Sequence, residues 1–240
     1  MDAFPHGRAR APHPVRAHRA PRPRSPRRRV ANGNRVLFLA RHGQTAVNAA
    51  GRLQGRSDAP LTALGRAQAA AIAVAVGAAG APALVVSSPL LRARQTAEAV
   101  ADAVGAAGDI VVDERWIELD YGELEGTELA SIAPELWAAW RGDPSFTPPG
   151  GESVAMLGER VRGACVELAE RAARETVVVV SHVSPIKAAV AWALGVGDEV
   201  SWRMFLDVAS ICRLAIRPQG PSLVSFNDVA HLSPLSGPPP

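Results

Sequence analysis

Sulfur, aromatic rings and long apolar runs are all scarce in this sequence, and each shortage narrows the class of protein. Only two cysteines occur, Cys165 and Cys212, without a CxxC pattern, so we expect buried thiols in a reducing compartment, the cytoplasm. Aromatic residues make up 5% of the chain, so alanine, valine and leucine must build most of the core. No apolar run reaches the roughly 18 residues that a membrane helix needs, so no membrane partner is expected.

The patterns that usually bind metal ions or nucleotides are missing as well. The chain has no HxH or HExxH spacing for zinc and no carboxylate cluster for magnesium. It also has no GxxxxGK loop to hold a nucleotide's phosphates. The sequence therefore predicts a protein that works with no metal ion and no other cofactor.

Positive charge is distributed unevenly along the chain. The net charge is +3, but residues 1–34 hold nine arginines against one acid, so the rest of the chain is acidic. These residues also contain six prolines and few large apolar side chains, which predicts a disordered basic tail. The folded domain is expected at 35–232 and a loose C-terminal tail at 233–240. Nucleic-acid binding is expected only if this basic tail provides it; a solvated extension or a start codon assigned too far upstream are the simpler interpretations.

Apolar runs alternate with helix-like segments through the predicted domain. We predict strands at 36–40, 83–88, 110–116, 176–182, 211–218 and 222–227, and helices at 60–77, 89–105, 128–141, 150–174 and 184–195. Thr62 is a candidate helix N-cap. This alternation predicts a three-layer α/β fold, with an open, mostly parallel sheet between helices on both faces. The last two strands are candidates for an antiparallel edge.

Charged and polar groups follow the ends of several predicted strands. Arg41 and His42 end the first strand, Arg92 follows the second, the third leads to Glu118, and His182 ends the 176–182 strand. Carboxyl ends of parallel strands meet at one edge of a sheet, where α/β proteins place their ligands. One such histidine would more often be a core residue, but two histidines with two arginines and a glutamate favour a site.

These residue types suit phosphoryl transfer through histidine. Two guanidinium groups can bind a tetrahedral dianion, and a neutral imidazole is a nucleophile. A nearby carboxyl group can protonate a leaving oxygen. Gly43, next to His42, allows a close backbone approach.

Five segments resemble, in the same order, motifs of the histidine phosphatase superfamily, which has the phosphoglycerate-mutase-like fold. They lie within residues 35–195 and read LARHGQTAVN with LQGRSDAPLTALGRAQA behind it, SSPLLRARQTAEAV, ERWIELDYGELEG, PGGES and VVVVSHVSPIKAAV. The SHVSPIK form, together with DPSFTPPGGES, looks most like the branch of α-ribazole-phosphatase-like and broad acid phosphatases of bacteria.

The resemblance implies a role for individual side chains. His42 would accept the phosphoryl group, and Glu118 would be the proton donor. Four side chains would bind the phosphate: Arg41, Asn48, Arg92 and His182. Many members have glycine after the second histidine, whereas this chain has Val183, whose effect on the mouth of the site stays open.

Further residues of these motifs have simpler interpretations. Four acids are expected to be surface charges: Asp113, Glu114, Asp120 and Glu123. Glu152 is expected either to cap its helix or to help hold the pocket, and Lys187 is expected to be a solvated helix lysine rather than a substrate contact. Three aromatic residues are candidates both for a substrate lid and for ordinary packing: Trp137, Trp140 and Phe146.

The resemblance predicts a phosphomonoester hydrolase that acts on a small phosphorylated metabolite through a phosphohistidine intermediate. A phosphoglycerate-type mutase is the alternative, but the lid candidate at 120–150 is short and rich in glycine, proline and alanine, which favours hydrolysis. A non-catalytic phospho-ligand-binding module is a further alternative, although no predicted pocket residue is lost. The identity of the substrate and the oligomeric state stay open.

Overall fold

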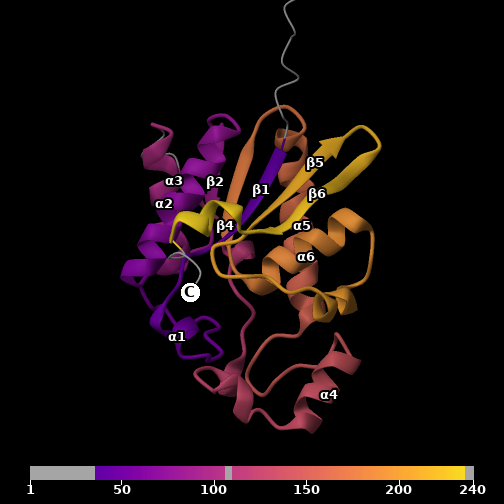
Figure 1. Cartoon of the computed structure of the whole chain (residues 1–240). Helices are drawn as coiled ribbons and strands as arrows, with labels where there is room; N and C mark the ends of the chain where they lie inside the picture. Colours follow the sequence, from indigo (N-terminus) through magenta and orange to yellow (C-terminus); the bar gives the residue numbers. More distant parts are fainter. Residues whose placement is uncertain (1–35, 106–109, 236–240) are drawn as a thin grey trace, which may run out of the picture. The chain divides into compact units, whose positions relative to one another are not determined.

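The computed structural model describes residues 36–105 and 110–235, in which strands and helices alternate (Figure 1). The strands are β1 (Val36–Arg41), β2 (Leu84–Ser87), β3 (Ile110–Val112), β4 (Val177–Ser181), β5 (Ile211–Arg217) and β6 (Gly220–Asp228). The α-helices are α1 (Ala46–Ala49), α2 (Ala63–Ala78), α3 (Leu91–Ala103), α4 (Pro134–Gly142), α5 (Val154–Ala172) and α6 (Val183–Leu194). Short 3₁₀ helices cover Glu114–Trp116, Gly122–Leu124, Leu129–Ser131, Asp198–Arg203 and Ala230–Leu235. The predicted basic tail at 1–34 lies outside the described residues, as do residues 236–240 of the predicted C-terminal tail.

The strands form one six-stranded sheet in the order β3-β2-β4-β1-β5-β6. Neighbours among the first four strands in this order pair in parallel, while β5 is antiparallel to β1, and β6 is antiparallel to β5. The prediction of a mostly parallel sheet is confirmed, and so is the antiparallel edge formed by the last two strands.

Strand β1 shows why the central strands are continuously apolar. Leu37 and Leu39 belong to the hydrophobic cluster on one face of the sheet, and Phe38 and Ala40 belong to the cluster on the other. Successive side chains of a strand point to opposite faces, so a strand covered on both sides must be apolar at every position. The run at the start of the predicted domain therefore marks a central strand.

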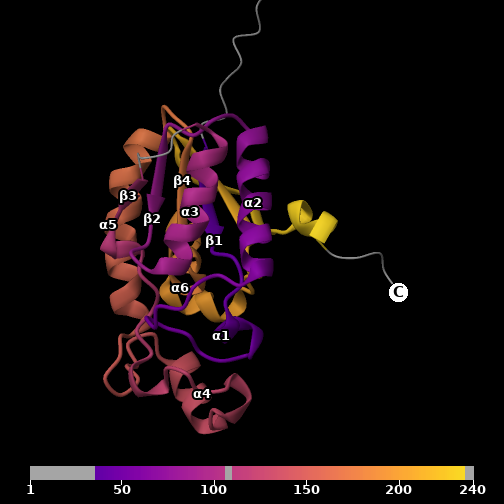
Figure 2. The same cartoon turned by 90° about the vertical axis from the view of Figure 1, so that its left-hand side faces the viewer.

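Helices cover both faces of the sheet, which confirms the three-layer prediction. Helices α2 and α3 pack together over one face, and α5 and α6 pack together over the other (Figures 1 and 2). The carboxyl ends of the parallel strands point to the end of the domain that carries α1 and α4 (Figures 1 and 2). The residues predicted to form a site should therefore gather at this end.

Side-chain caps start two of the long helices. The Thr62 hydroxyl accepts a hydrogen bond from the Gly65 N–H (3.0 Å), so Thr62 is the N-cap of α2 as predicted. Ser153 caps α5 in the same way, through the Met156 N–H (3.1 Å).

Three predicted elements are wrong in extent. The helix predicted at 150–174 spans only Val154–Ala172, after its Ser153 cap. The predicted strand 110–116 stops at Val112, because β2, its only neighbour in the sheet, ends opposite that residue at Ser87. The Asp113 carboxylate then caps a 3₁₀ turn by accepting from the Arg115 N–H (2.9 Å). The predicted helix 128–141 begins only at Pro134, which occupies the first turn of α4.

The scarce residue types occupy ordinary positions in this fold. Cys165 and Cys212 are both buried and free, as expected. Among the residues that the structure describes, no helix is long and apolar enough to cross a membrane.

Candidate phosphate-binding and catalytic site

The pairing of β1 with β4 brings the two strand-end histidines together. Arg41 lies opposite Ser181 in this parallel pair, so His42 and His182 leave the sheet side by side. Their ring centroids are 5.0 Å apart, and both side chains are buried. The backbone N–H of His42 also donates to the Ser181 carbonyl (3.0 Å), which holds His42 against the end of β4.

Hydrogen bonds define the tautomer of His42. Its Nδ1 lies 2.7 Å from the Gly43 carbonyl oxygen, and because a carbonyl only accepts, Nδ1 carries the proton. Nε2 is then the lone-pair nitrogen, and the Arg92 Nε–H donates to it (3.2 Å). Burial, followed by the charges of Arg92 and Arg41, holds the pKa of His42 well below 6.5. The imidazole is therefore neutral near pH 7, with a nucleophilic nitrogen available.

The loop after His42 depends on a pair of glycines. A Cβ on Gly43 would collide with the backbone of Gly65, and one on Gly65 would collide with the Gln44 carbonyl. The close approach expected at Gly43 is thus an approach to the start of α2, which fixes the position of His42 relative to that helix.

His182 presents an unsatisfied nitrogen. The Ser88 hydroxyl accepts from the Leu90 N–H (3.4 Å) and lies 2.7 Å from the His182 Nε2, to which it can donate. The proton of a neutral imidazole then sits on Nδ1, which is buried and has no hydrogen-bond partner among the described residues. Burial, then Arg92 and His42, keeps the pKa of His182 well below 6.5. His182 is thus a neutral donor that lacks an acceptor.

Arg92 reaches the site from the first turn of α3. Its guanidinium donates from Nη1 to the Ser57 carbonyl (2.8 Å) and from Nη2 to the Gly55 carbonyl (2.7 Å). Burial lowers the pKa of Arg92 to about 10, so it stays charged at neutral pH. Each terminal nitrogen carries two protons, so each keeps one for a ligand.

Arg41 and Asn48 complete the predicted phosphate ligands. Arg41 donates from Nη1 to the Leu206 carbonyl (2.7 Å), and its buried Nε has no partner among the described residues. The Asn48 amide oxygen accepts from the Thr45 N–H (3.2 Å) and hydroxyl (3.0 Å), closing a capping box at the start of α1. Only the NH₂ end of Asn48 is left to donate to an anion.

Glu118 is buried and held by backbone donors. Its Oε1 accepts from the Leu119 N–H (2.7 Å) and the Ser184 N–H (3.2 Å). Both bonds fall on Oε1, so Oε2 is the oxygen that can carry a proton toward a leaving group. The backbone N–H of Ser184, the residue after Val183, therefore binds Glu118.

Charged side chains that no sequence motif indicated hold the backbone of Glu118. The Glu152 carboxylate accepts from Arg160 (2.8 and 2.9 Å) and Arg56 (3.2 Å). Both arginines also donate to the Glu118 carbonyl oxygen, at 3.4 Å from Arg56 and 3.3 Å from Arg160. Ser153, not Glu152, caps α5, so the structure supports the pocket-holding alternative for Glu152.

Three predicted surface charges lie elsewhere than expected. Asp113 is bound by the Arg115 guanidinium at 2.7 Å, and Asp120 lies 3.2 Å from the Arg56 guanidinium. Both carboxylates are partly buried, because each closes a turn next to its paired arginine. Lys187 lies one turn after Val183 and lines a cavity at this edge of the sheet. Burial lowers the pKa of Lys187, so it is not a solvated helix lysine. Glu114 and Glu123 are exposed as predicted.

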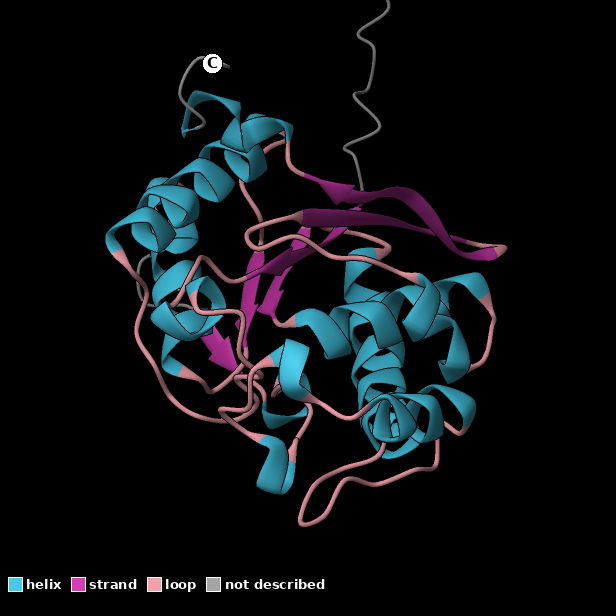
Figure 3. Ribbon diagram, turned by 60° about the horizontal axis from the view of Figure 1, so that its bottom comes forward, coloured by secondary structure: helices cyan, strands magenta, loops and turns pink. Residues whose placement is uncertain are grey.

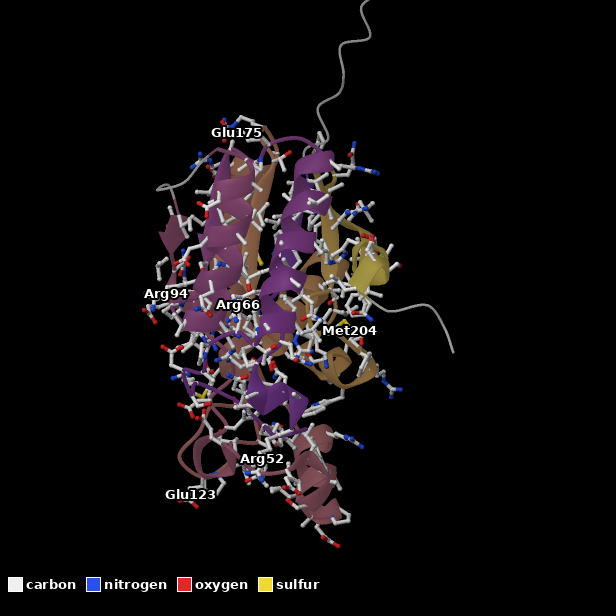
Figure 4. The ribbon with its side chains drawn as sticks, turned by 60° about the vertical axis from the view of Figure 1, so that its left-hand side comes forward. Arg52, Arg66, Arg94, Glu123, Glu175 and Met204 are labelled. Carbon is white, nitrogen blue, oxygen red and sulfur yellow. The ribbon has the colours of Figure 1, made fainter. Side chains whose placement is uncertain are left out.

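The predicted site residues surround one cavity of about 390 Å³. The view of this end in Figure 3 shows loops and short helices gathered around the carboxyl ends of the strands, and Figure 4 places Arg52 near α4 and Glu175 at the opposite end. The cavity is lined by Arg41, His42, Asn48, Arg52, Leu53, Gln54, Gly55, Arg92, Glu118, Tyr121, Leu129, Trp137, Trp140, Val183, Lys187, Trp202, Phe205 and Leu206. His182 lies just beneath it, against His42.

The polar groups at this cavity are mostly cations and N–H donors, which attract anions rather than metal ions. Within residues 36–105 and 110–235, no group of three or more histidine, cysteine, aspartate or glutamate side chains could hold a metal ion.

We expect activity to survive prolonged treatment with EDTA, because the cavity presents arginine and histidine side chains and offers a single carboxylate to a metal ion. The measurement is the initial rate of phosphate release before and after chelation. A loss of activity that magnesium or zinc restores would contradict this prediction.

A buried, neutral histidine lies among arginines at the carboxyl edge of an open α/β sheet. This defines the class as an α/β protein with a pocket suited to anions around that histidine. The model of the histidine phosphatase superfamily (branch 1) matches residues 37–229. The chain belongs to this superfamily, and the resemblance of its five motifs is confirmed.

Two relatives show how far the similarity extends. A bifunctional protein of Mycobacterium tuberculosis is 39% identical over 237 residues, which cover 97% of this chain and 65% of that protein. This chain thus spans less than two thirds of that relative. A probable phosphoglycerate mutase of Yersinia enterocolitica is 35% identical over 206 residues, covering 82% of this chain and 94% of the relative.

Two of the solved structures that are similar to this chain are structures of phosphatases. A mycobacterial glucosyl-3-phosphoglycerate phosphatase in complex with VO3 superimposes with a TM-score of 0.73 at 32% identity, covering 80% of this chain and 98% of that one. A phosphoserine phosphatase mutant from Entamoeba histolytica, in complex with phosphoserine, gives a TM-score of 0.74 at 27% identity and covers 82% and 98% of the two chains.

Proposed function

We propose that this chain hydrolyses a small phosphomonoester through a phosphohistidine formed on His42. The observation that carries the proposal is the Nε2 lone pair of a neutral His42, set among donors that lack acceptors. The His182 Nδ1 and the Arg41 Nε are such donors, and a phosphate would supply the oxygens they need.

In the first step, the His42 Nε2 attacks phosphorus as the bond from phosphorus to the leaving oxygen breaks. Glu118 gives a proton to that oxygen, which leaves as an alcohol. Arg41, Arg92 and His182 hold the oxygens of the phosphoryl group and stabilise its negative charge as it passes to nitrogen.

In the second step, water attacks the phosphohistidine. Glu118, now ionised, accepts a proton from this water while the bond from phosphorus to Nε2 breaks. Inorganic phosphate leaves, and His42 returns to its neutral state, with its proton on Nδ1 still donated to the Gly43 carbonyl oxygen. Glu118 regains its proton, and no group is consumed.

A phosphoglycerate-type mutase is the second candidate, because relatives of this chain are described as probable phosphoglycerate mutases. A mutase must keep water from its phosphohistidine while the intermediate turns over. The segment between Glu118 and α5 is short: it holds two single-turn 3₁₀ helices and α4. This favours hydrolysis.

A panel of phosphorylated metabolites separates the two activities. Hydrolysis predicts one inorganic phosphate released for each alcohol formed. Conversion of 3-phosphoglycerate to its 2-phospho isomer, without release of phosphate, would contradict hydrolysis and support the mutase.

We further propose a cytoplasmic location and a small-molecule substrate. The two free, buried cysteines support a reducing compartment, and the size of the cavity suits a metabolite rather than a macromolecule. We assign no nucleic-acid partner to the domain.

A further inference from the structure

Aromatic residues are concentrated on one part of the cavity wall. The chain has only five tryptophans and one tyrosine, and three of those tryptophans and the tyrosine line this cavity. Trp137 and Trp140 come from α4, and Trp202 comes from the 3₁₀ helix Asp198–Arg203. Because aromatic side chains are otherwise scarce, their concentration here needs a local reason.

The three indoles and Tyr121 form a packed cluster, which we call the aromatic wall. Trp137 and Trp140 are stacked, with ring centroids 5.7 Å apart and an interplanar angle of 19°. Trp140 meets the edges or faces of Trp202 and Tyr121, each at 5.6 Å. Trp140 is only 1% exposed, so its neighbours hold it in place and the wall is pre-organised.

Phe205 extends this apolar surface to the mouth of the cavity. Its side chain is 72% exposed, although it lines the cavity next to Leu206. A large exposed aromatic ring at the rim of a binding cavity gains stability only when a ligand covers it.

Two cations of the cavity lie at the reacting nitrogen. The charges of Arg41 and Arg92 act on the His42 imidazole, and the Arg92 Nε–H donates to its Nε2. Arg52 is paired with Glu128 at 2.8 Å. The Arg141 guanidinium lies over the Trp137 ring of the aromatic wall, 5.1 Å from its centroid.

We propose that the leaving group of the substrate carries a flat apolar ring that packs against the aromatic wall and Phe205. This inference rests on the proposed hydrolysis and adds the chemical class of the alcohol. A cavity of about 390 Å³ is in the range of small-molecule sites, so it has room for a phosphate and a ring.

Two esters with similar leaving alkoxides test the proposal: 2-phenylethyl phosphate and ethyl phosphate. The chemical step is nearly the same for both, so a difference in kcat/KM reports the contact with the ring. We expect 2-phenylethyl phosphate to have a kcat/KM at least ~10-fold higher, from the burial of one phenyl ring. We expect 3-phosphoglycerate, whose leaving group has no ring, to have a lower kcat/KM than 2-phenylethyl phosphate.

Variants locate the effect. Phe205→Ala and Trp137→Leu should lower the ratio of the two kcat/KM values by roughly 3- to 10-fold, the size of an aromatic contact. Val74→Ala, an exposed apolar residue of α2 outside the cavity, should leave the ratio unchanged and serves as the control. Phe205 is so exposed that its replacement should not unfold the domain, whereas the fold of Trp137→Leu must be checked by its melting temperature.

The outcomes separate this proposal from the hydrolysis on which it rests. Phosphate released from both esters at equal kcat/KM, or a higher value for 3-phosphoglycerate, would overturn the ring proposal and leave hydrolysis intact. An unchanged ratio in Phe205→Ala and Trp137→Leu alike would also overturn it. Failure to release phosphate from any ester would overturn hydrolysis itself, and the ring proposal with it.

Discussion

Replacing His42 by alanine should abolish turnover and the phosphoenzyme together. The neighbouring His182 cannot replace His42 as nucleophile, because it lies beneath the cavity with its Nε2 against the Ser88 hydroxyl. Removing the nucleophile of a covalent mechanism costs as much as ~10⁶-fold in kcat.

The measurement for His42→Ala has two parts. Steady-state release of phosphate should fall below ~1% of the wild-type rate. Rapid acid quench with a labelled ester should trap an acid-labile phosphoprotein in the wild type and none in the variant. His231→Ala is the matched control, because His231 is the only other histidine of the described residues and lies outside the cavity, bonded to the Ala209 carbonyl. Residual activity above that limit, in a variant that melts like the wild type, would contradict the assignment of His42.

Replacing Glu118 by glutamine should slow alkyl esters far more than nitrophenyl esters. Glutamine keeps an oxygen that can accept from the Leu119 and Ser184 N–H groups, so the backbone around the side chain is preserved. What it removes is the acidic proton. An alkoxide needs that proton in the transition state, while nitrophenolate leaves well without it. General acid catalysis contributes about 100- to 10,000-fold, and an alkyl phosphate should lose most of this factor.

The test of Glu118→Gln must isolate the first step. Hydrolysis of the phosphohistidine also uses Glu118, so a slow second step would hide the contrast in steady-state rates. The formation of phosphoenzyme should therefore be timed directly with an alkyl ester and with p-nitrophenyl phosphate. Glu123→Gln, an exposed acid in the neighbouring 3₁₀ helix, is the matched control. An equal loss for both esters in the first step would assign Glu118 a structural or electrostatic role instead.

The fold was largely predictable because its signals are local. Continuous apolar runs such as that of β1 indicate strands buried on two faces, and Thr62 marks a helix start by its own hydrogen bond. The end of β3 was not predictable, since Val112 is its last residue only because its partner β2 stops at Ser87. Such an end is decided by pairing with a distant segment, not by the residues themselves.

Some residues of the site could be placed from the sequence, and others could not. His42 and His182 could be placed together from the sequence, because parallel strands end at one edge and both histidines follow such strands. The contacts of Glu152 with Arg56 and Arg160 could not be predicted, because Arg56 lies 96 residues from Glu152 in the sequence and meets the other two only in the folded chain. Trp202 and Phe205 come from a segment without a recognisable motif, so their place in the cavity wall had no sequence signal either.

The stereochemical course at phosphorus tests the account most directly, because it does not require the intermediate to accumulate. A thiophosphate ester made chiral at phosphorus with oxygen isotopes would be hydrolysed in water of a third oxygen isotope. Attack by the His42 Nε2 followed by attack by water makes two in-line displacements, so the account predicts overall retention of configuration. Inversion would mean that water displaces the alcohol in a single step, and it would contradict a phosphohistidine on the reaction path.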